Sequence, residues 1–431
     1  VPSSAPTAPP TATPSNVPTL APTNAPTMTA VWVPPNPVPD DPPQGYFNYN
    51  INDKTYGPDL WDRVDTSNHP LREFGEVGFG VWKGHWAHKT PTENRCGGAA
   101  RQQSPKNLVR VAGGSESGEC DATHEIRSSK YEIAARLLCM CLTPNKLLSS
   151  IECGSYPVNS DQYQKLILPH KLSLVMNRRP CLNVEDDQCH IGDPPLADYP
   201  RYSNTASSFS DLLFFDVKVP GEHTLEGVTF DAEIQMLHTH IDDRRVSSLG
   251  IPVRATANGT NREFQEVLYQ FQLTYDRDAA ACALKRRYTR RAASKFHNES
   301  TSVNEEEDSD WELEYSRELD DPELSDRKLQ RKVFNPYSES YMPSIFFYRY
   351  DGSTTEPPCF PITWWVMMDP MIISFEQLNQ LKRLLFTHVD GKCTKTSVHN
   401  ADQEVTRPIQ PLGEERGIQK CPPGSFKWDE E

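Results

Sequence analysis

Short runs of apolar residues, each about the length of one β-strand, are the feature that most restricts what this chain can fold into. They lie between clusters of turn-forming residues, and several alternate apolar with polar side chains. That length and alternation are typical of strands, whereas an amphipathic helix repeats its apolar residues every three or four positions. The predicted strands are 166–168, 172–176, 212–219, 230–237, 268–273, 345–350 and 362–368.

Helical periodicity is sparse in the same part of the chain. The best candidates are residues 131–142 and 374–386. In the second, Ser374 can serve as the N-cap and Gln377 can complete a capping box. These patterns predict a β-rich single domain with a few helices.

The first 45 residues differ in composition from the rest of the chain. Residues 1–45 consist mainly of Pro, Thr, Ala and Ser, with near-repeats such as SAPTAP and LAPTNAPT. Such a segment has too few apolar side chains to bury a core, and its prolines favour extended conformations. We predict a disordered stalk, which is either a plain flexible linker or an O-glycosylated spacer.

Charge and cysteine content restrict the partners and the compartment. The formal net charge of −15 disfavours binding to a nucleic acid, whose phosphates are also negative. Eleven cysteines without a zinc-type CxxC pair favour an oxidising compartment, and their odd number leaves one thiol that is free or linked to another chain. Sequons at Asn258 and Asn298 agree with a secreted glycoprotein, located outside the cell or in the secretory-pathway lumen. The longest apolar stretch, 362–374, is interrupted and too short to span a membrane.

Two blocks of opposite charge lie close together in the second half of the chain. Residues 285–295 are basic and residues 305–326 are rich in acids. We predict an exposed insertion whose blocks pair with each other or with a partner, or are simply solvated. The paired arginines at 286–287 and 290–291 could also be cut by a processing protease.

Four segments carry a resemblance to a known family. They are YGPDLW at 56–61, CGGAARQQSPKNL at 96–108, the stretch 212–238 containing GEHT, and 352–378 containing GSTTEPPC. In order and spacing they resemble the α-carbonic anhydrases. The resemblance implies a mainly β (α+β) fold with a large twisted, mostly antiparallel sheet and a few short helices.

The resemblance also implies how the chain is divided. The related domain covers 46–390, with insertions near 109–160 and 275–335, and leaves 391–431 as a C-terminal extension. Secreted members of the family have a disulfide at the positions of Cys96 and Cys359, so that bond is expected here.

The family's metal ligands are missing from this sequence. Its reaction uses zinc held by three histidines, which lowers the pKa of the bound water to about 7. The matching positions here are Asp216, Lys218 and Gln235. A lysine ammonium repels Zn²⁺ and offers no lone pair, so we expect no zinc and no other cofactor. His238 and His240 have the spacing of a ligand pair, but the third ligand and the GEHT turn do not fit that register, so a surface or packing role is favoured.

Other positions of the family's site are kept in part. Glu222 and Thr355 match the pair that orients the attacking hydroxide, and His170 falls near the proton-shuttle position. Glu356 replaces a small residue and adds a negative charge. We therefore treat these four residues as the surroundings of a degenerate site.

The three replacements suggest an ion-pair network in place of the metal. We predict that Asp216 and Glu356 neutralise Lys218, and that Gln235 supplies a remaining hydrogen bond. A buried charge is tolerated when it is paired and hydrogen-bonded, and is very costly otherwise.

The leading hypothesis is a non-catalytic carbonic-anhydrase-like module that acts in binding or in the assembly of an extracellular structure. Its partner would be a protein or a glycan, and a disulfide-linked or homo-oligomeric contact is possible. A different hypothesis keeps the pocket as a site for a small anion such as bicarbonate. Its contacts would be Lys218, Thr355 and His170.

The alternative is a working enzyme, a carbonic anhydrase with an unorthodox metal site. Asp216, Glu222, Gln235 and Glu356 could supply oxygen ligands to a hard cation such as Mn²⁺ or Ca²⁺. Lys218 opposes this alternative unless its side chain swings away or loses its proton.

Overall fold

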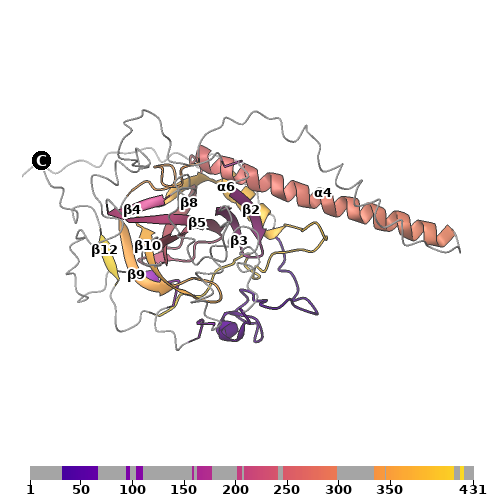
Figure 1. Ribbon diagram of the computed structural model, residues 1–431, viewed down its shortest axis with the longest axis horizontal. Coiled ribbons are helices and arrows are strands. Elements are labelled where there is room, and N and C mark those ends of the chain that lie inside the picture. The colour runs from indigo at the N-terminus through magenta and orange to yellow at the C-terminus, as the bar shows by residue number, and fades with distance from the viewer. Residues whose placement is uncertain are drawn as a thin grey trace, which may run out of the picture. The chain divides into compact units, whose positions relative to one another are not determined.

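The computed structural model describes residues 32–66, 94–97, 103–109, 158–159, 163–176, 201–205, 208–240, 246–298, 334–344, 346–411 and 418–421. The chain divides into two units, 1–32 and 33–431, and the second contains all the secondary structure described below (Figure 1). The predicted helix at 131–142 and residues 1–31 of the predicted stalk lie outside the described residues.

One large sheet dominates the second unit. Its strands follow the order β12-β9-β10-β8-β7-β5-β3-β2, with β11 beside β8 and β4 beside β5. Most neighbours are antiparallel, and β8 pairs in parallel with both β10 and β11. The mainly β fold with a large, mostly antiparallel sheet is therefore confirmed. The strands of this sheet are β2 (Tyr163–Leu168), β3 (Lys171–Met176), β4 (Arg201–Thr205), β5 (Ser208–Lys218), β7 (Ala232–His240), β8 (Val246–Thr256), β9 (Phe347–Ser353), β10 (Pro361–Met367), β11 (Met371–Ser374) and β12 (Gln419–Cys421).

Smaller elements complete the region around the sheet. Strands β1 (Asn107–Leu108) and β6 (Thr224–Leu225) form a separate parallel pair, and a 3₁₀ helix, η1, covers Pro58–Arg63. In η1, the indole of Trp61 is fully buried and donates a hydrogen bond to the carbonyl oxygen of Asn48.

Side-chain alternation separates the two faces of the central strands. On β5, Phe215 and Val217 enter the hydrophobic core, and on β7, Ile234 and Met236 do the same. Because successive strand residues point to opposite faces, the residues between them project to the other face. That face carries the polar residues of the candidate site.

Helix α6 (Phe375–Phe386) begins where the sequence predicts it. The Ser374 hydroxyl accepts a hydrogen bond from the backbone N–H of Gln377, whose side chain in turn accepts one from the backbone N–H of Ser374. The predicted capping box is thus confirmed.

Helix α4 (Arg262–Asn298) corrects one strand prediction. Residues 268–273 were expected to form a strand, and they lie inside this helix of 37 residues. Its buried residues Phe264, Val267, Leu268 and Phe271 recur every three or four positions, so a longer window reveals helical periodicity that the run alone hides. The basic block 285–295 belongs to the same helix.

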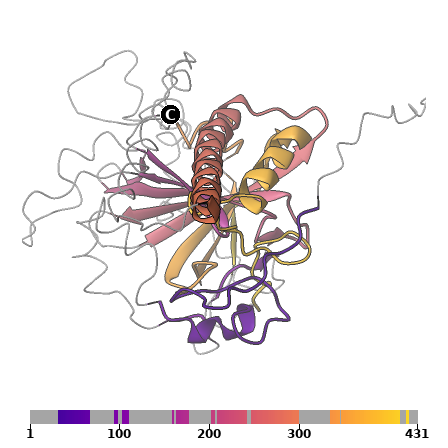
Figure 2. The ribbon, with the colours of Figure 1, turned by 90° about the vertical axis from the view of Figure 1, so that its right-hand side faces the viewer.

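Figures 1 and 2 show α4 beside α6 and extending past the edge of the sheet. A disulfide between Cys282 and Cys393 fastens the middle of α4 to the segment that follows α6. The side chains of Lys285, Arg286 and Arg287, beyond that disulfide, are exposed. No helix in the described ranges is long and apolar enough to cross a membrane.

The segments at both ends of the second unit hydrogen bond to the domain. The backbone N–H of Val33 donates to the side chain of Gln403, and the Asn36 amide donates to the carbonyl of Ser397. Farther along, the backbone N–H of Val405 donates to the carbonyl of Val219, which directly follows β5. The end of the predicted stalk and the start of the predicted C-terminal extension are thus attached to the domain.

Candidate functional site

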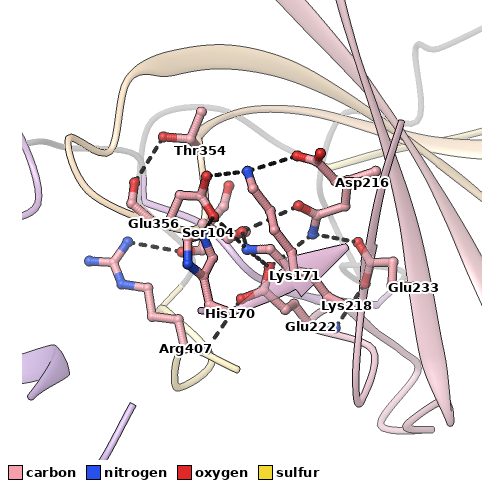
Figure 3. A network of polar contacts seen from close by, with 12 residues as sticks. Ser104, His170, Lys171, Asp216, Lys218, Glu222, Glu233, Thr354, Glu356 and Arg407 are labelled. Carbon is pink, nitrogen blue, oxygen red and sulfur yellow. Dashed lines mark hydrogen bonds and ion pairs between the residues drawn. The ribbon is translucent and has the colours of Figure 1, made fainter. Parts of the chain in front are cut away.

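Two neighbouring strands supply the centre of the site. In the β5–β7 register, Asp216 lies opposite Gln235 and Lys218 lies opposite Glu233. All four side chains are buried. Figure 3 shows Asp216, Lys218 and Glu233 within the polar network. The sheet therefore brings together the three positions that the sequence comparison singled out, and it places them next to the loop that carries Thr355 and Glu356.

The Lys218 side chain is fully buried, and its ammonium group donates hydrogen bonds to Glu222 and Thr355 and forms an ion pair with Glu356. Its Nζ lies 2.9 Å from Glu222 Oε2, 2.9 Å from Thr355 Oγ1 and 3.1 Å from Glu356 Oε2. An ammonium has three N–H donors, and three acceptors surround this one. Burial alone would lower the pKa of Lys218, but the two carboxylates outweigh it and raise the pKa above its ordinary value.

Lys171, at the start of β3, is a second buried cation in the site. Its Nζ lies 2.8 Å from Asp216 Oδ2 and 2.5 Å from Glu356 Oε1. Burial lowers the pKa of Lys171, yet Asp216 and Glu356 outweigh it, so the pKa is raised. Lys171 is therefore positively charged at neutral pH.

The partner of Asp216 differs from the sequence prediction. Asp216 was expected to neutralise Lys218, and it pairs with Lys171 instead. In the β3–β5 register Asp216 lies opposite Ser173, which donates a hydrogen bond to Asp216 Oδ1. Lys171 is two residues before Ser173 and therefore shares its face of the sheet, within reach of the carboxylate.

Glu356 links the two lysines. Its Oε1 faces Lys171, while its Oε2 faces Lys218 and also lies 2.7 Å from Nε2 of His170. Burial raises the pKa of Glu356, but both lysines outweigh it and hold the pKa well below its usual range. Burial also lowers the pKa of His170, and Glu356 only partly offsets this. The ion pairs thus form a continuous series in which negative and positive side chains alternate. We call this series the five-charge chain; it consists of Asp216, Lys171, Glu356, Lys218 and Glu222.

Glu222, at one end of the five-charge chain, accepts further hydrogen bonds in addition to its contact with Lys218. Glu222 accepts hydrogen bonds from the side-chain amide of Gln235 at 2.9 Å and from the backbone N–H of Arg407 at 3.3 Å. Gln235 donates to Glu233 as well, at 3.0 Å. Gln235 thus supplies a hydrogen bond within the network, although it reaches Glu222 and Glu233 rather than Lys218.

Glu233 fixes the turn that carries Glu222. One of its oxygens accepts hydrogen bonds from the backbone N–H groups of Glu222 and His223, and the other lies 2.7 Å from Nδ1 of His223. Burial raises the pKa of Glu233, but the neighbouring His223 outweighs it and lowers the pKa. The other ring nitrogen of His223 lies 2.6 Å from the hydroxyl of Tyr350, so the turn is held from both sides.

These residues do not fit a zinc ion or a hard cation. Of the three positions that match the zinc histidines, one holds an ammonium, one an amide and one a carboxylate already paired with Lys171. The oxygen donors considered for Mn²⁺ or Ca²⁺ are held apart by Lys171 and Lys218, and each carboxylate among them already has a cationic partner. Within the described ranges, no group of three or more His, Cys, Asp or Glu residues could hold a metal ion.

His238 has a packing role. Its side chain is fully buried, and its Nε2 lies 2.7 Å from the hydroxyl of Tyr337. Burial lowers the pKa of His238 to about 3, so the ring is neutral at physiological pH. The side chain of His240 lies outside the described residues.

A disulfide anchors the loop that supplies Thr355 and Glu356. Cys96 and Cys359 are bonded, as the family resemblance implied. The carbonyl oxygen of Cys96 also accepts a hydrogen bond from the buried guanidinium of Arg407. The disulfide joins the N-terminal part of the chain to the site loop, and the hydrogen bond from Arg407 adds the C-terminal segment.

Sequence reasoning missed Lys171 and Ser173. Both project from β3, a strand that supplies no metal ligand in the related family, so alignment of ligand positions gave no reason to examine it. A signal was present in the alternation KLSLVM, where Lys171 and Ser173 interrupt an otherwise apolar strand. All six residues of that strand are buried, so its two polar side chains mark a buried polar face.

The sequence is similar to carbonic anhydrases over limited segments. A family model described as eukaryotic-type carbonic anhydrase matches residues 309–420. Carbonic anhydrase 7 of Mus musculus is 37% identical over 91 residues, which cover 21% of this chain and 31% of that protein. Carbonic anhydrase 12 of Homo sapiens is 42% identical over 59 residues, covering 13% and 17%. The chain thus matches less than a third of the length of these curated relatives.

Solved structures of low sequence identity are also similar. The α-carbonic anhydrase from Thermovibrio ammonificans, in complex with the inhibitor sulfanilamide, is 16% identical, with a TM-score of 0.37 and coverage of 87% of this chain and 99% of that one. Dioscorin complexed with ascorbate gives 16% identity and a TM-score of 0.37, with coverage of 87% and 98%. The inhibitor and the ascorbate are ligands of those proteins.

Proposed function

Because this chain belongs to the α-carbonic anhydrase family, we propose that its five-charge chain has replaced the zinc site and that the domain is a non-catalytic module for binding or assembly outside the cell. The observation that carries this proposal is the environment of Lys218. Its ammonium occupies a zinc-ligand position, fully buried, with three acceptors around its three donors.

The chemistry of the family explains why this matters. A zinc ion supplies a hydroxide at neutral pH, because it lowers the pKa of the water it binds. The lysines of this site are buried donors without a free lone pair, and Glu222 and Thr355 direct their oxygens at Lys218. Glu222 and Thr355, which match the pair that orients the hydroxide in the family, therefore bind the ammonium group of Lys218 instead.

The same contacts disfavour an anion-binding pocket. Lys218, Thr355 and His170 were the candidate contacts for a small anion. Lys218 and His170 already face buried carboxylates, and the Thr355 hydroxyl accepts a hydrogen bond from Lys218. An anion would therefore have to displace a carboxylate and leave it buried without its partner, which costs several kcal/mol.

The extracellular part of the proposal rests on covalent chemistry. Two disulfides among the described residues hold distant parts of the domain together, and such bonds persist in oxidising compartments. The Pro- and Thr-rich segment at the start of the chain would keep the domain at a distance from whatever it is attached to. A protein or a glycan of an extracellular assembly is the partner class that we propose.

The sequon at Asn258 provides a test of secretion. Asn258 is exposed in the turn between β8 and α4, which leaves room for a glycan. Expressed in a eukaryotic secretory host, the protein should lose mass on treatment with an N-glycosidase. Asn258→Gln should remove one glycan, with Asn298→Gln as the matched control for the second sequon. A wild-type protein whose mass is unaffected by the glycosidase would contradict this expectation.

The enzymatic claim is tested by stopped-flow measurement of CO₂ hydration. We expect the purified full chain to give the rate of the buffer alone, with and without added zinc, while an active carbonic anhydrase measured in parallel gives a large rate. Hydration by this chain that disappears in Asp216→Asn would overturn the proposal and support the unorthodox metal site instead.

A further inference from the structure

We propose that Lys171 is a second determinant of metal exclusion, independent of the three replaced ligand positions, so that restoring three histidines alone will not restore a metal site. This inference rests on the proposed function, because it concerns why the same site rejects a metal. Lys171 occupies no ligand position, and it would remain after such a restoration.

The position of Lys171 is fixed by the sheet. The residue is 5% exposed, and its ammonium points at Asp216, the first of the three replaced positions, at 2.8 Å. It also keeps a second carboxylate, Glu356, at 2.5 Å. Removal of Asp216 therefore leaves Lys171 with a charged partner, and Lys171 has no reason to leave the site or to lose its proton.

An imidazole at position 216 would meet that ammonium. Lys171 has N–H donors and no lone pair, so it would donate a hydrogen bond to the ring nitrogen that a metal needs. In addition, a positive charge a few ångströms from a bound dication is strongly repulsive in a buried site. Both effects oppose metal binding even when three histidines are present.

Lys218 differs from Lys171 in this respect. It stands at one of the replaced ligand positions, so substitution by histidine removes its charge. The two lysines thus exclude a metal in separate ways. Lys218 replaces a ligand. Lys171, on the neighbouring strand, would donate a hydrogen bond to the ligand nitrogen at position 216 and repel the metal ion.

The test compares three variants of the full chain. The first variant carries Asp216→His, Lys218→His and Gln235→His. The second carries these three substitutions and Lys171→Met. The third carries the same three and Lys171→Arg, as a control that keeps the charge. Zinc affinity is measured by competition with a chromophoric chelator. We expect the variant with Lys171→Met to bind about one zinc per chain, and the other two to bind at least ~100-fold more weakly. Equal zinc affinities of the first and second variants would overturn the inference.

A second measurement does not depend on a restored metal site and needs at most two substitutions. In Asp216→His, the pKa of the new histidine is followed by NMR with labelled histidine and compared with that in Asp216→His/Lys171→Met. We expect a pKa lower by about one unit or more when Lys171 is present. The same pKa in both proteins would show that the ammonium does not act on position 216, and would also overturn the inference.

The failure of this inference is distinguishable from the failure of the proposed function. Stoichiometric zinc in the unmodified chain would overturn the proposed function. An unmodified chain free of zinc, together with a three-histidine variant that binds zinc regardless of residue 171, would overturn only the role of Lys171.

Discussion

Replacing Lys218 with methionine is expected to lower the free energy of unfolding by about 3–5 kcal/mol at pH 7. The methionine fills a similar volume, but it leaves Glu222 without its cationic partner and Glu356 with Lys171 alone. A buried carboxylate without a partner destabilises the folded state by much more than an intact buried ion pair stabilises it. Chemical denaturation of the two proteins under identical conditions measures the difference.

The pH dependence of this loss has a defined sign. In the wild type the pKa of Glu356 is depressed, so its contribution to stability is present above its ordinary pKa of 4.5 and is lost as the pH falls through the lower folded value. The pKa of Lys218 is raised, so its contribution is present below 10.5 and is lost as the pH rises past the folded value. The difference between wild type and variant should therefore be largest between these limits and should shrink in acid, where the carboxylates are protonated.

Lys54 offers a matched control for this prediction. It also forms an ion pair with a carboxylate, Asp59 at 3.5 Å, but both side chains are largely exposed. Lys54→Met should leave the unfolding transition unchanged, because exposed pairs contribute little. A Lys218→Met protein as stable as the wild type at pH 7 would show that the five-charge chain does not hold the site together.

Removal of the Cys96–Cys359 disulfide is the second change with a large expected effect. The bond closes a loop with a sequence separation of 263 residues, so the double variant Cys96→Ser/Cys359→Ser should lose about 2–5 kcal/mol of unfolding free energy. The second disulfide, Cys282–Cys393, closes a shorter loop with a separation of 111 residues and provides the comparison. In the loop-entropy description its removal should cost about 0.8 kcal/mol less.

Position in the fold should increase that difference. Cys359 follows the loop that supplies Thr355 and Glu356, whereas Cys282 lies in the middle of α4, away from the site. Denaturation of both double variants without reductant provides the measurement. A Cys96/Cys359 variant that unfolds at the same denaturant concentration as the wild type would contradict the anchoring role assigned to this bond.

Much of the sheet was predictable because alternation is a local signal. The run FDVK at 215–218 alternates core residues with site residues, so it places them on opposite faces, and the Ser374–Gln377 capping box is also local. The prediction of a strand at 268–273 was wrong because a short run alone does not determine the type of element. Six apolar-rich residues fit a strand or a buried helix equally well, and only the surrounding periodicity of the 37-residue helix α4 distinguishes them.

The site was predictable in most of its members, although not in Lys171 or Ser173, and its pairing was not predictable. Alignment to the family identified Asp216, Lys218 and Gln235, and the physical cost of a buried charge required nearby partners. Which carboxylate faces which lysine depends on the neighbouring strand, and the β3–β5 register that brings Lys171 to Asp216 is a tertiary feature. The Cys282–Cys393 bond is hidden in the same way, because it joins a helix to a segment far along the chain.

Metal analysis of the purified chain tests whether the five-charge chain has replaced the zinc site. The 431-residue chain would be produced in zinc-supplemented medium, dialysed without a strong chelator, and analysed for zinc, manganese and calcium per chain. Because two ammonium groups are paired with the carboxylates of the site, we expect less than about one metal ion per ten chains. A near-stoichiometric metal ion that is lost in Asp216→Ala would contradict it, and would mean that the site still binds a cation.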